Sequence, residues 1–505
     1  MKSLSALPWS ASAFVLTLSS PSASQIELHW SNGVLGSSVH YSIEDAPPGP
    51  VFLFQSVEGL AGSPVFFVFD PAVPLQQIGG GTVGPLAGPA EQAGGLSFAL
   101  PAEPSLSGLV LRAWVQVPGS GGALQGTAGP VRFLLSLPDE CHPAPGASPL
   151  AREWHSQTVL PDGRVLIAGG VDSTAGSWEL FDPALQGVTG ATFALPDARS
   201  RHTATRLPDG RVLLVGGLDG TGKVSAGAVI VDPVAGTAVA VSSMARPRVL
   251  HRAVLLEDGQ VLVIGGTSAF SDGHPIGYPA SLEFLVPEVE LYDPASDTWT
   301  TLLGLDFPFL GHAATRLGDG RVLVSGGLDK AGSVSADYLL YDPDLQTFVH
   351  IAPLPAARAL HGQIQTAGGG ALVLGGAGQA AVGGTLAPLS ATVVFDPVTM
   401  QWSPGADLNV GSCASNPVCV PDEEEGGFKY ITGTGLGSIP LSTLEPGSAP
   451  QLVRTRLYWT SDPGAAWTAA PVACTATPGQ GLTPVDGGLR VLITGMAGAA
   501  LYTVP

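Results

Sequence analysis

The chain has 505 residues and carries few charges, with only 12% Asp, Glu, Lys and Arg, while glycine (68 residues) and proline (45 residues) are abundant. This composition favours many short strands joined by tight turns and argues against long helices. The length is enough for two or three domains. The net charge of −20 repels phosphate backbones, so the sequence argues against nucleic-acid binding.

The N-terminus has the pattern of an export signal. Lys2 gives a positive start, residues 6–18 are apolar, and Ser22 and Ser24 are small residues that suit a cleavage site. We therefore expect residues 1–24 to be a signal peptide and the protein to be secreted or held in the cell envelope. No later stretch is apolar for long enough to predict a membrane-spanning helix.

Residues 25–140 contain dense apolar runs separated by segments rich in glycine, proline and serine. The runs are 51–54, 65–69, 109–117 and 131–137. Short apolar runs between turn-forming segments are typical of a small antiparallel β-fold. We expect a β-sandwich-like domain over 25–140 and a second domain over 141–505.

An internal repeat dominates the second region. A histidine opens each of five units, at His155, His202, His251, His312 and His361. A Gly-Gly pair begins 14 positions after each histidine, at Gly169, Gly216, Gly265, Gly326 and Gly375. A fixed spacing of this kind is the signature of a repeat architecture in which each unit is one supersecondary element.

The units also share turn signals. Asp-Gly stands between two apolar runs in four of them, at 162–163, 209–210, 258–259 and 319–320, and predicts a tight hairpin. Each unit then closes on Asp-Pro, at 182–183, 232–233, 293–294, 342–343 and 396–397. The pattern predicts four antiparallel strands per unit: histidine to Asp-Gly, back to Gly-Gly, out to Asp-Pro, and a return.

These motifs resemble the kelch repeat, most closely in its glycine-rich, galactose-oxidase-like form. The matching elements are an arginine three residues before the histidine, Asp-Gly-Arg-Val-Leu, Gly-Gly and Tyr-Asp-Pro followed by an aromatic residue; the arginines are Arg152, Arg199, Arg248 and Arg358, whereas the fourth unit has Phe309. The resemblance implies an all-β fold, a propeller of about seven four-stranded blades. Six blades remain possible, because the last two units are degenerate.

The degenerate units affect the ends of the propeller. Cys413 and Cys474 are interpreted as occupying the histidine position in the sixth and seventh units, the second because Cys474-Thr-Ala-Thr matches His202-Thr-Ala-Thr. The seventh unit stops without a fourth strand. We expect a segment within 131–150 to supply it and so to close the ring.

Four cysteines in an exported chain suggest two disulfides, and their pairing is open among three connectivities. We favour Cys413 with Cys419 and Cys141 with Cys474. The alternative pairs Cys413 with Cys474.

The repeated histidines have two readings. They could form a ring of ligands or proton donors near the axis, or they could make one structural hydrogen bond in every blade. We favour the structural reading, because a residue that recurs in every blade serves the blade. A copper-radical oxidase of the galactose-oxidase kind is disfavoured, since the chain has no Tyr-His dipeptide and no suitably placed cysteine. We therefore predict no metal, no cofactor and no catalytic residues.

A ligand site is expected on the face that carries the histidines. The loop between the second and third strands opens on that face and is longest in the third and sixth units. The candidate ligand-binding residues are His274, Tyr278, Arg454 and Arg456. We predict a monomeric, non-catalytic binding module for a glycan or protein ligand. The alternative is an extracellular carbohydrate-active or oxidase-like enzyme with a site built from these loops.

Overall fold

The structure is a computed structural model. It describes residues 149–407 apart from 172–175, 184, 271–283, 303–304, 306–309, 352, 367 and 380–385. Outside that range it describes the strands given below with Ser107, Leu109 and Ala144, mostly as backbone alone. These residues form strands and no α-helix, and they contain no helix of the length and apolarity needed to cross a bilayer. The predicted signal peptide lies outside them.

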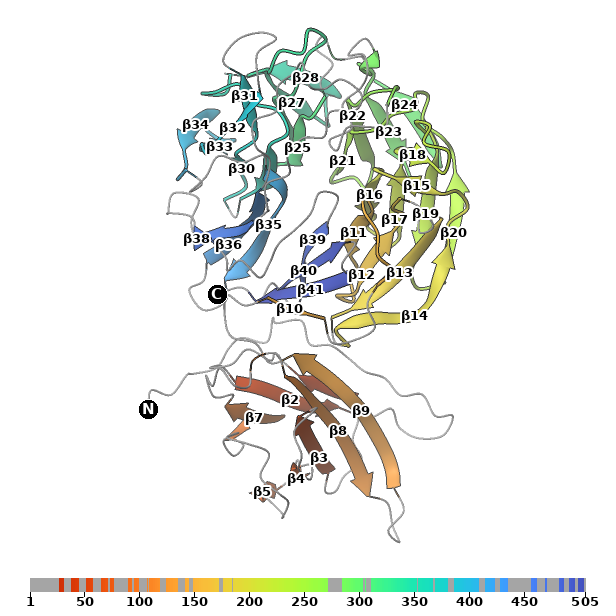
Figure 1. Ribbon diagram of the computed structural model, residues 1–505, viewed down its shortest axis with the longest axis vertical. Coiled ribbons are helices and arrows are strands. Elements are labelled where there is room, and N and C mark those ends of the chain that lie inside the picture. Colours follow the sequence, from red (N-terminus) through yellow and green to blue (C-terminus); the bar gives the residue numbers. More distant parts are fainter. Residues whose placement is uncertain are drawn as a thin grey trace.

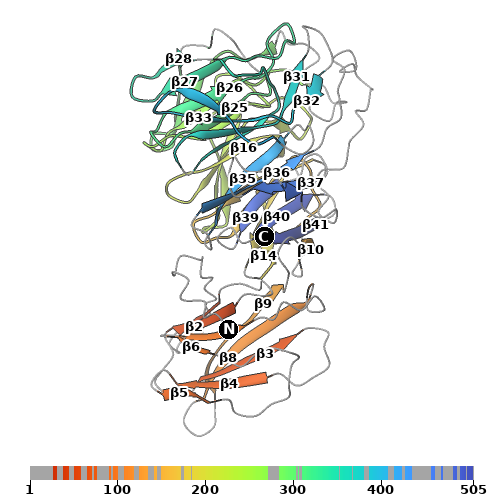
Figure 2. The same ribbon diagram turned by 90° about the vertical axis from the view of Figure 1, so that its left-hand side faces the viewer.

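The N-terminal strands form two antiparallel sheets. One has the order β1-β2-β7-β6 and the other β5-β4-β3-β8-β9. Their bounds are β1 (Glu27–Trp30), β2 (Ser38–Glu44), β3 (Val51–Val57), β4 (Val65–Asp70), β5 (Val73–Gln76), β6 (Ala90–Gln92), β7 (Gly95–Ala99), β8 (Val110–Pro118) and β9 (Leu124–Leu134). Figures 1 and 2 show them as a group apart from the remaining sheets. The β-sandwich and the domain boundary at 140/141 stay predictions.

The described part of the remaining chain is a β-propeller with six four-stranded blades, each formed by one continuous stretch of the sequence (Figure 1). The first three blades are β11 (Ser156–Val159), β12 (Val165–Ala168), β13 (Ser177–Asp182) and β14 (Gly187–Ala194); β16 (Thr203–Arg206), β17 (Val212–Val215), β19 (Ala228–Asp232) and β20 (Thr237–Val241); and β21 (Arg252–Leu255), β22 (Val261–Ile264), β23 (Glu290–Asp293) and β24 (Thr298–Thr301).

The next three blades follow the same plan. They are β25 (Ala313–Arg316), β26 (Val322–Ser325), β27 (Tyr338–Asp342) and β28 (Thr347–His350); β29 (Gly362–Gln365), β30 (Ala371–Leu374), β33 (Thr392–Asp396) and β34 (Gln401–Pro404); and β35 (Ala414–Asp422), β36 (Gly427–Thr434), β37 (Arg456–Thr460) and β38 (Thr468–Ala469). Two small two-stranded sheets accompany them, β15 (Arg199–Ser200) with β18 (Leu218–Asp219) and β31 (Ala377–Gln379) with β32 (Leu386–Pro388).

A further four-stranded sheet joins the two ends of this region. Its order is β10-β41-β40-β39, with bounds β10 (Cys141–Pro143), β39 (Gly481–Val485), β40 (Arg490–Gly495) and β41 (Gly498–Thr503). β10 pairs antiparallel with β41, so a strand from 131–150 does complete the last sheet, as expected. The inner strand β39 contacts β11 on one side and β35 on the other.

This sheet corrects one interpretation of the sequence. β39 begins at Gly481, well beyond Cys474, so Cys474 does not stand directly before the first strand, where the histidines stand. The match of Cys474-Thr-Ala-Thr to His202-Thr-Ala-Thr was wrong, because it ignored the spacing to the following glycine, which is 21 rather than 14 positions (474 to 495). In the sixth unit, β35 begins directly after Cys413, which itself lies outside the described residues.

The predicted Asp-Gly hairpins join the first two strands of the blades. Gly163 has a φ of 83° and donates its N–H to the carbonyl of Leu160 at 3.0 Å. Asp162 accepts from the backbone N–H of Arg164 at 3.1 Å and from its Nε at 2.8 Å. Asp209 with Arg211 repeats this clamp in the second blade. The Asp-Gly-Arg motif therefore fixes the turn through a glycine in a left-handed conformation and a local ion pair.

The core consists of layers between neighbouring blades. One cluster joins Leu262, Ile264 and Leu291 of the third blade to Val322 and Tyr341 of the fourth. The second strands carry most of this burial, and all four residues are buried in β12, β17, β22, β26 and β30. Because a middle strand is covered on both faces, its run of Val, Leu and Ile need not alternate.

The Gly-Gly pair is required by close packing between blades. Gly216, with a φ of 60°, lies so near the third blade that a Cβ built on it would be 2.6 Å from the carbonyl oxygen of Arg248 and 2.8 Å from Cε1 of His251. The second glycine, Gly217, packs against its own blade: a Cβ built on it would be 2.7 Å from the backbone nitrogen of His202. Each of these histidines is therefore enclosed by a glycine of the preceding blade and one of its own.

We predict that Gly216→Ala destabilises the protein much more than Gly190→Ala. Both residues have positive φ, but nothing lies within 4 Å of a Cβ at Gly190. The left-handed conformation alone costs alanine about 1–2 kcal/mol. The clash at Gly216 adds about 1–3 kcal/mol of overpacking. Chemical denaturation of the two variants measures the difference, and equal losses would contradict the packing role of the pair.

Candidate functional site: the histidine face and the channel mouth

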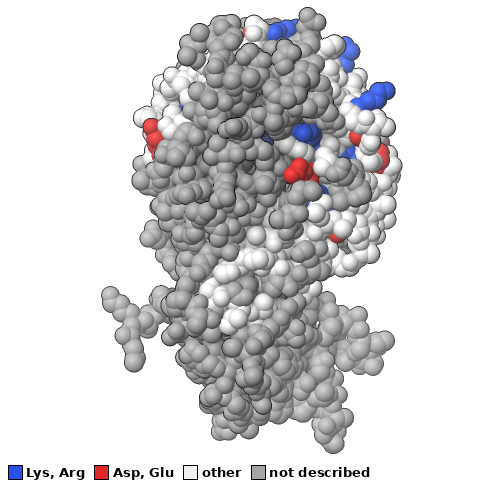
Figure 3. Space-filling model, in the orientation of Figure 1, with Lys and Arg blue, Asp and Glu red and all other residues white. Residues whose placement is uncertain are grey.

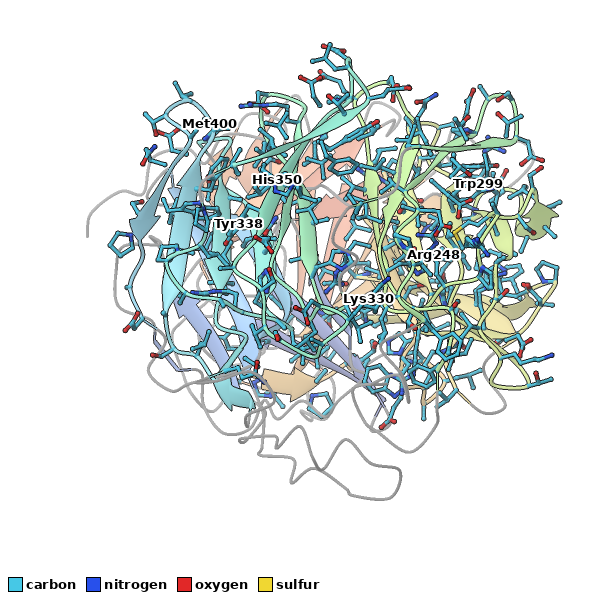
Figure 4. All side chains as sticks on the ribbon, turned by 90° about the horizontal axis from the view of Figure 1, so that it is seen from above. Arg248, Trp299, Lys330, Tyr338, His350 and Met400 are labelled. Atoms are coloured by element: carbon cyan, nitrogen blue, oxygen red, sulfur yellow. The ribbon has the colours of Figure 1, made fainter. Side chains whose placement is uncertain are left out.

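The two faces of the propeller differ as the sequence predicts. Lys330 lies in the loop between β26 and β27, and Met400 in the turn between β33 and β34. Figure 4 shows the ring edge-on, with these two residues toward opposite edges. The loops that follow Gly-Gly thus share one face, here called the histidine face, and the Asp-Pro turns occupy the other.

The predicted ligand-binding residues are only partly placed. His274, Tyr278 and Arg454 lie outside the described residues, and Arg456 opens β37, of which only the backbone is described. Their role stays a prediction. Phe270 and Phe284 flank the third-blade insert and are described, so the point where that insert leaves the blade is known. Figure 3 shows one face of the molecule, on which the charged side chains that are coloured are scattered.

The repeated histidines make hydrogen bonds from blade to blade. Nε2 of His202 lies 2.9 Å from Oγ of Ser156, and Nε2 of His251 lies 2.9 Å from Oγ1 of Thr203. His361 reaches Oγ of Ser325 in the preceding blade at 2.7 Å. His155 closes the series on Oγ1 of Thr494 in the β39–β41 sheet, at 2.6 Å. This is the arrangement that the structural reading of the histidines requires.

Burial keeps these histidines neutral. Burial and the nearby Arg152 lower the pKa of His155 to about 4, and burial with Arg248 lowers the pKa of His251 to about 3. Burial also holds the pKa of His202 and His361 well below the usual range, with Arg199 and Arg358 adding to the effect. A buried neutral imidazole with a neighbouring hydroxyl as partner is suited to holding two blades together, not to exchanging protons near neutral pH.

The arginine that stands three residues before four of the five histidines is a second buried element of the repeat. Nη1 of Arg152 donates to the carbonyl of Gly169 at 2.6 Å, and Nη1 of Arg358 donates to that of Gly375 at 2.9 Å. Each guanidinium thus binds the first glycine of its own blade, where β12 or β30 ends. Nη2 of Arg152 donates to Glu179 at 2.7 Å, so the buried charge is paired. The arginine therefore links the segment before the first strand to the end of the second strand and the start of the third.

Arg252 breaks the pattern of small residues that directly follow the histidines. The other described blades have Ser156, Thr203, Ala313 and Gly362 at this position. Arg252 opens β21, an inner strand in contact with β16 and β25, and its Nε donates to the carbonyl of His312 in the next blade at 3.1 Å.

The charge of Arg252 lies toward the centre of the ring, where the inner strands β16, β21 and β25 contact one another in sequence. It contributes to the lowered pKa of both His251 and His361, which belong to the third and fifth blades. Arg252 is exposed to solvent, yet desolvation by the surrounding protein lowers the pKa of its guanidinium. Among the described residues, no carboxylate is within ion-pair distance of it. The centre of the ring therefore contains a cation without an acidic partner in the described part of the chain.

The residues that directly precede the histidines form the channel mouth, defined here as Trp154, Arg201, Leu250, Gly311 and Leu360 together with Arg252. The first five all have left-handed backbones, with φ between 55° and 68°. Arg201 N–H donates to the Trp154 carbonyl at 2.9 Å, and Leu360 N–H donates to the Gly311 carbonyl at 2.7 Å. Such a conformation is uncommon outside glycine, so its recurrence shows that the fold imposes it.

An aromatic and cationic stack lies at this mouth. The guanidinium carbon of Arg201 is 3.6 Å from the centroid of the Trp154 ring and 5.0 Å from that of Phe270. All three side chains are half-buried. Cation–π contact of this kind orders an arginine at a surface. Phe270 is the last described residue before the third-blade insert, so the insert leaves the blade beside this stack.

Sequence reasoning missed Trp154, Arg201 and Arg252. For Arg252 the signal was available in the alignment of the repeats, because the position directly after the histidine is small in the other four units and is arginine in the third. The described residues contain no group of three or more His, Cys, Asp or Glu side chains that could hold a metal ion. The arrangement offers donors and aromatic surface for binding a polar ligand.

Comparison with known proteins gives a distant likeness. No family model matches the chain. Beta-scruin from Limulus polyphemus is 31% identical over 119 residues, which is 22% of this chain, and the chain spans only 13% of the length of that relative. The solved structure of YjhT superposes with a TM-score of 0.46 at 16% identity, covering 64% of this chain and 99% of that one.

We predict that acidification destabilises the protein through its buried histidines. An unfolded histidine takes up a proton near pH 6.5, whereas His155 and His251 stay neutral down to about pH 4 and 3 when folded. Between these limits the unfolded state binds more protons, so the free energy of unfolding falls as pH falls. Each histidine contributes up to about 1.4 kcal/mol per pH unit. Urea unfolding at pH 7 and pH 5.5 measures the loss. His251→Gln should be less stable at pH 7 but lose less on acidification, and an unchanged loss would contradict the assignment.

We also predict that Glu290→Ala lowers the free energy of unfolding far more than Glu288→Ala does. Glu290 and Arg248 form an ion pair in which both side chains are 0% exposed, and Glu290 also accepts from the N–H of Ala245 at 2.6 Å. Removing one partner of a buried pair costs about 3–5 kcal/mol. Glu288 pairs with Arg246, whose side chain is 60% exposed, so its loss should cost about 0–1 kcal/mol. Thermal unfolding of the two variants compares them.

Proposed function

We propose that this chain, a kelch-type β-propeller, is an exported, non-catalytic binding module whose ligand binds at the channel mouth on the histidine face. The observation that carries the proposal is Arg252, a cation in the central channel at a position where the neighbouring blades have Ser, Thr, Ala or Gly. A residue that departs from the repeat and is unpaired among its described neighbours is available to a ligand, while the repeated histidines are engaged in contacts between blades.

We propose further that the β10-β41-β40-β39 sheet is a seventh blade. Its support is the contact of β39 with both β11 and β35 and the hydrogen bond from His155 to Thr494, which matches the bonds between neighbouring blades elsewhere in the ring. A closed ring has no free sheet edge and holds the channel mouth rigid. Rigidity favours recognition, because little ordering is needed on binding.

The ligand that fits best is a polar glycan or protein segment carrying an acidic group. An unpaired guanidinium recognises carboxylate, sulfate or phosphate groups. Trp154 and Phe270 add flat apolar surface at the rim. The third-blade insert with His274 and Tyr278, and the sixth-blade residues Arg454 and Arg456, would extend this surface on the same face. The alternative, an extracellular enzyme, would show turnover of a bound substrate.

We expect Arg252→Gln to weaken ligand binding by roughly 10–100-fold while leaving the fold intact, because a hydrogen bond to a charged group contributes about 1.5–3 kcal/mol. The full chain is screened against acidic and neutral saccharides and acidic peptides, and the best ligand is then titrated calorimetrically. Arg246→Gln is the matched control, since Arg246 is an exposed arginine paired with Glu288 outside the channel. Equal affinity of the two variants, or conversion of the ligand, would overturn the proposal.

A further inference from the structure

Three of the four buried arginines of the repeat, Arg152, Arg199 and Arg248, use their two terminal nitrogens for two different kinds of partner. Nη1 binds backbone carbonyls of the blade, and Nη2 binds a carboxylate. The carboxylate partners are Glu179 for Arg152 at 2.7 Å, Asp197 for Arg199 at 2.6 Å, and Glu290 for Arg248. In these three blades the positive charge that the fold buries is balanced by a side chain.

Arg358, in the fifth blade, keeps the backbone contacts but has no carboxylate partner among the residues whose side chains the structure describes. Its Nη1 donates to the carbonyls of Gly375 and Ala391, each at 2.9 Å, and its side chain is 0% exposed. Its Nη2 is buried and has no hydrogen-bond partner among the described residues. Asp407 is exposed and is not within ion-pair distance. The segments 380–385 and 408–413, which lie outside the description, contain no acidic residue.

A second buried donor without a partner among the described residues belongs to the neighbouring fourth blade. Tyr338 is 1% exposed, and its Oη is buried without a hydrogen-bond partner among the described residues. The backbone N–H of Arg358 donates to the carbonyl of Ser335 at 3.0 Å. The segment that leads into β27, which begins at Tyr338, is therefore hydrogen-bonded to Arg358. Each of the two side chains affects the pKa of the other. Burial raises the pKa of Tyr338, so its hydroxyl group keeps its proton. The Tyr338 ring is fixed against Trp402, with 4.4 Å between centroids. Figure 4 shows Tyr338 among the blades, away from both edges of the ring.

The chemistry of this pair restricts what can satisfy it. A guanidinium does not give up its proton in a protein, and a buried charge without a counterion is strongly unfavourable. Arg358 supplies N–H donors and a net charge, and Tyr338 supplies an O–H donor. A water molecule could accept from both but would bring no charge and two further hydrogens that need acceptors. A small monovalent anion accepts from both donors and balances the charge.

We propose that the interface between the fourth and fifth blades binds a chloride ion between Nη2 of Arg358 and Oη of Tyr338, in place of the carboxylate that pairs with the corresponding arginine in the first three blades. The ion is a structural ligand of the propeller. It is independent of the channel mouth, because Arg358 is fully buried and faces the gap between β30 and β33.

The test is the dependence of the melting temperature of the full chain on chloride, with sodium gluconate keeping the ionic strength constant. A ligand of the folded state gives a saturable increase, here about 1–3 °C. Tyr338→Phe should shift saturation to higher chloride. Tyr341→Phe is the matched control, because Tyr341 Oη is also buried without a partner but belongs to the interface between the third and fourth blades. It should keep the full response.

Ala356→Asp provides the decisive variant. Residue 356 stands two positions before Arg358, as Asp197 stands two positions before Arg199. The new carboxylate should replace the ion, so the melting temperature should no longer depend on chloride. In crystals grown with bromide, an anomalous peak is expected between Arg358 and Tyr338. A melting temperature equal in chloride and gluconate overturns the proposal. A chloride response that survives in both Tyr338→Phe and Ala356→Asp reports an adventitious ion only, and also overturns it.

Discussion

The propeller depends on a buried histidine placed between two blades. The imidazoles of His202, His251 and His361 are each enclosed by the first glycine of the preceding blade and the second glycine of their own. Four of the five repeated histidines reach a hydroxyl group of the preceding sheet. The close approach is possible only without a Cβ, which explains why histidine and Gly-Gly keep one fixed spacing. Because the contact lies near the axis, it also sets how closely the inner strands approach each other and thus the width of the channel.

The buried arginine of the repeat binds the same Gly-Gly segment from within its own blade. The guanidinium of Arg152 binds the carbonyl of Gly169, so this glycine is held by an arginine on its carbonyl side while the next blade packs against its Cα. The arginine and the histidine are three residues apart and act on adjacent parts of one backbone segment. Substitution of either should therefore affect both contacts, and double variants in one blade are expected to be non-additive.

Much of this fold is readable in the sequence because its signals are local and repeated. The Asp-Gly turns, the buried second strands and the closing strand before residue 150 all follow from patterns within one unit or from counting strands. The channel mouth is different. Arg252, Arg201 and Trp154 come from three blades, and their proximity follows only once the ring exists. The acidic partners of the arginines are also hidden, since they lie at unrelated offsets: two residues before Arg199 but 42 residues after Arg248. The misassigned Cys474 shows that a four-letter match is weaker than a conserved spacing.

The pairing of β10 with β41 has a consequence for the order in which the molecule assembles. Its register joins Cys141 to Tyr502, positions that are 361 residues apart (502 − 141). The six blades formed from consecutive strands use mostly local hairpins, which form early and at small entropic cost. The β10–β41 pairing can form only after β41 has been synthesised, and it must then bring two distant segments together. In the proposed seven-bladed ring we therefore expect the chain to form an open array of blades during synthesis, and the ring to close in a late step of folding.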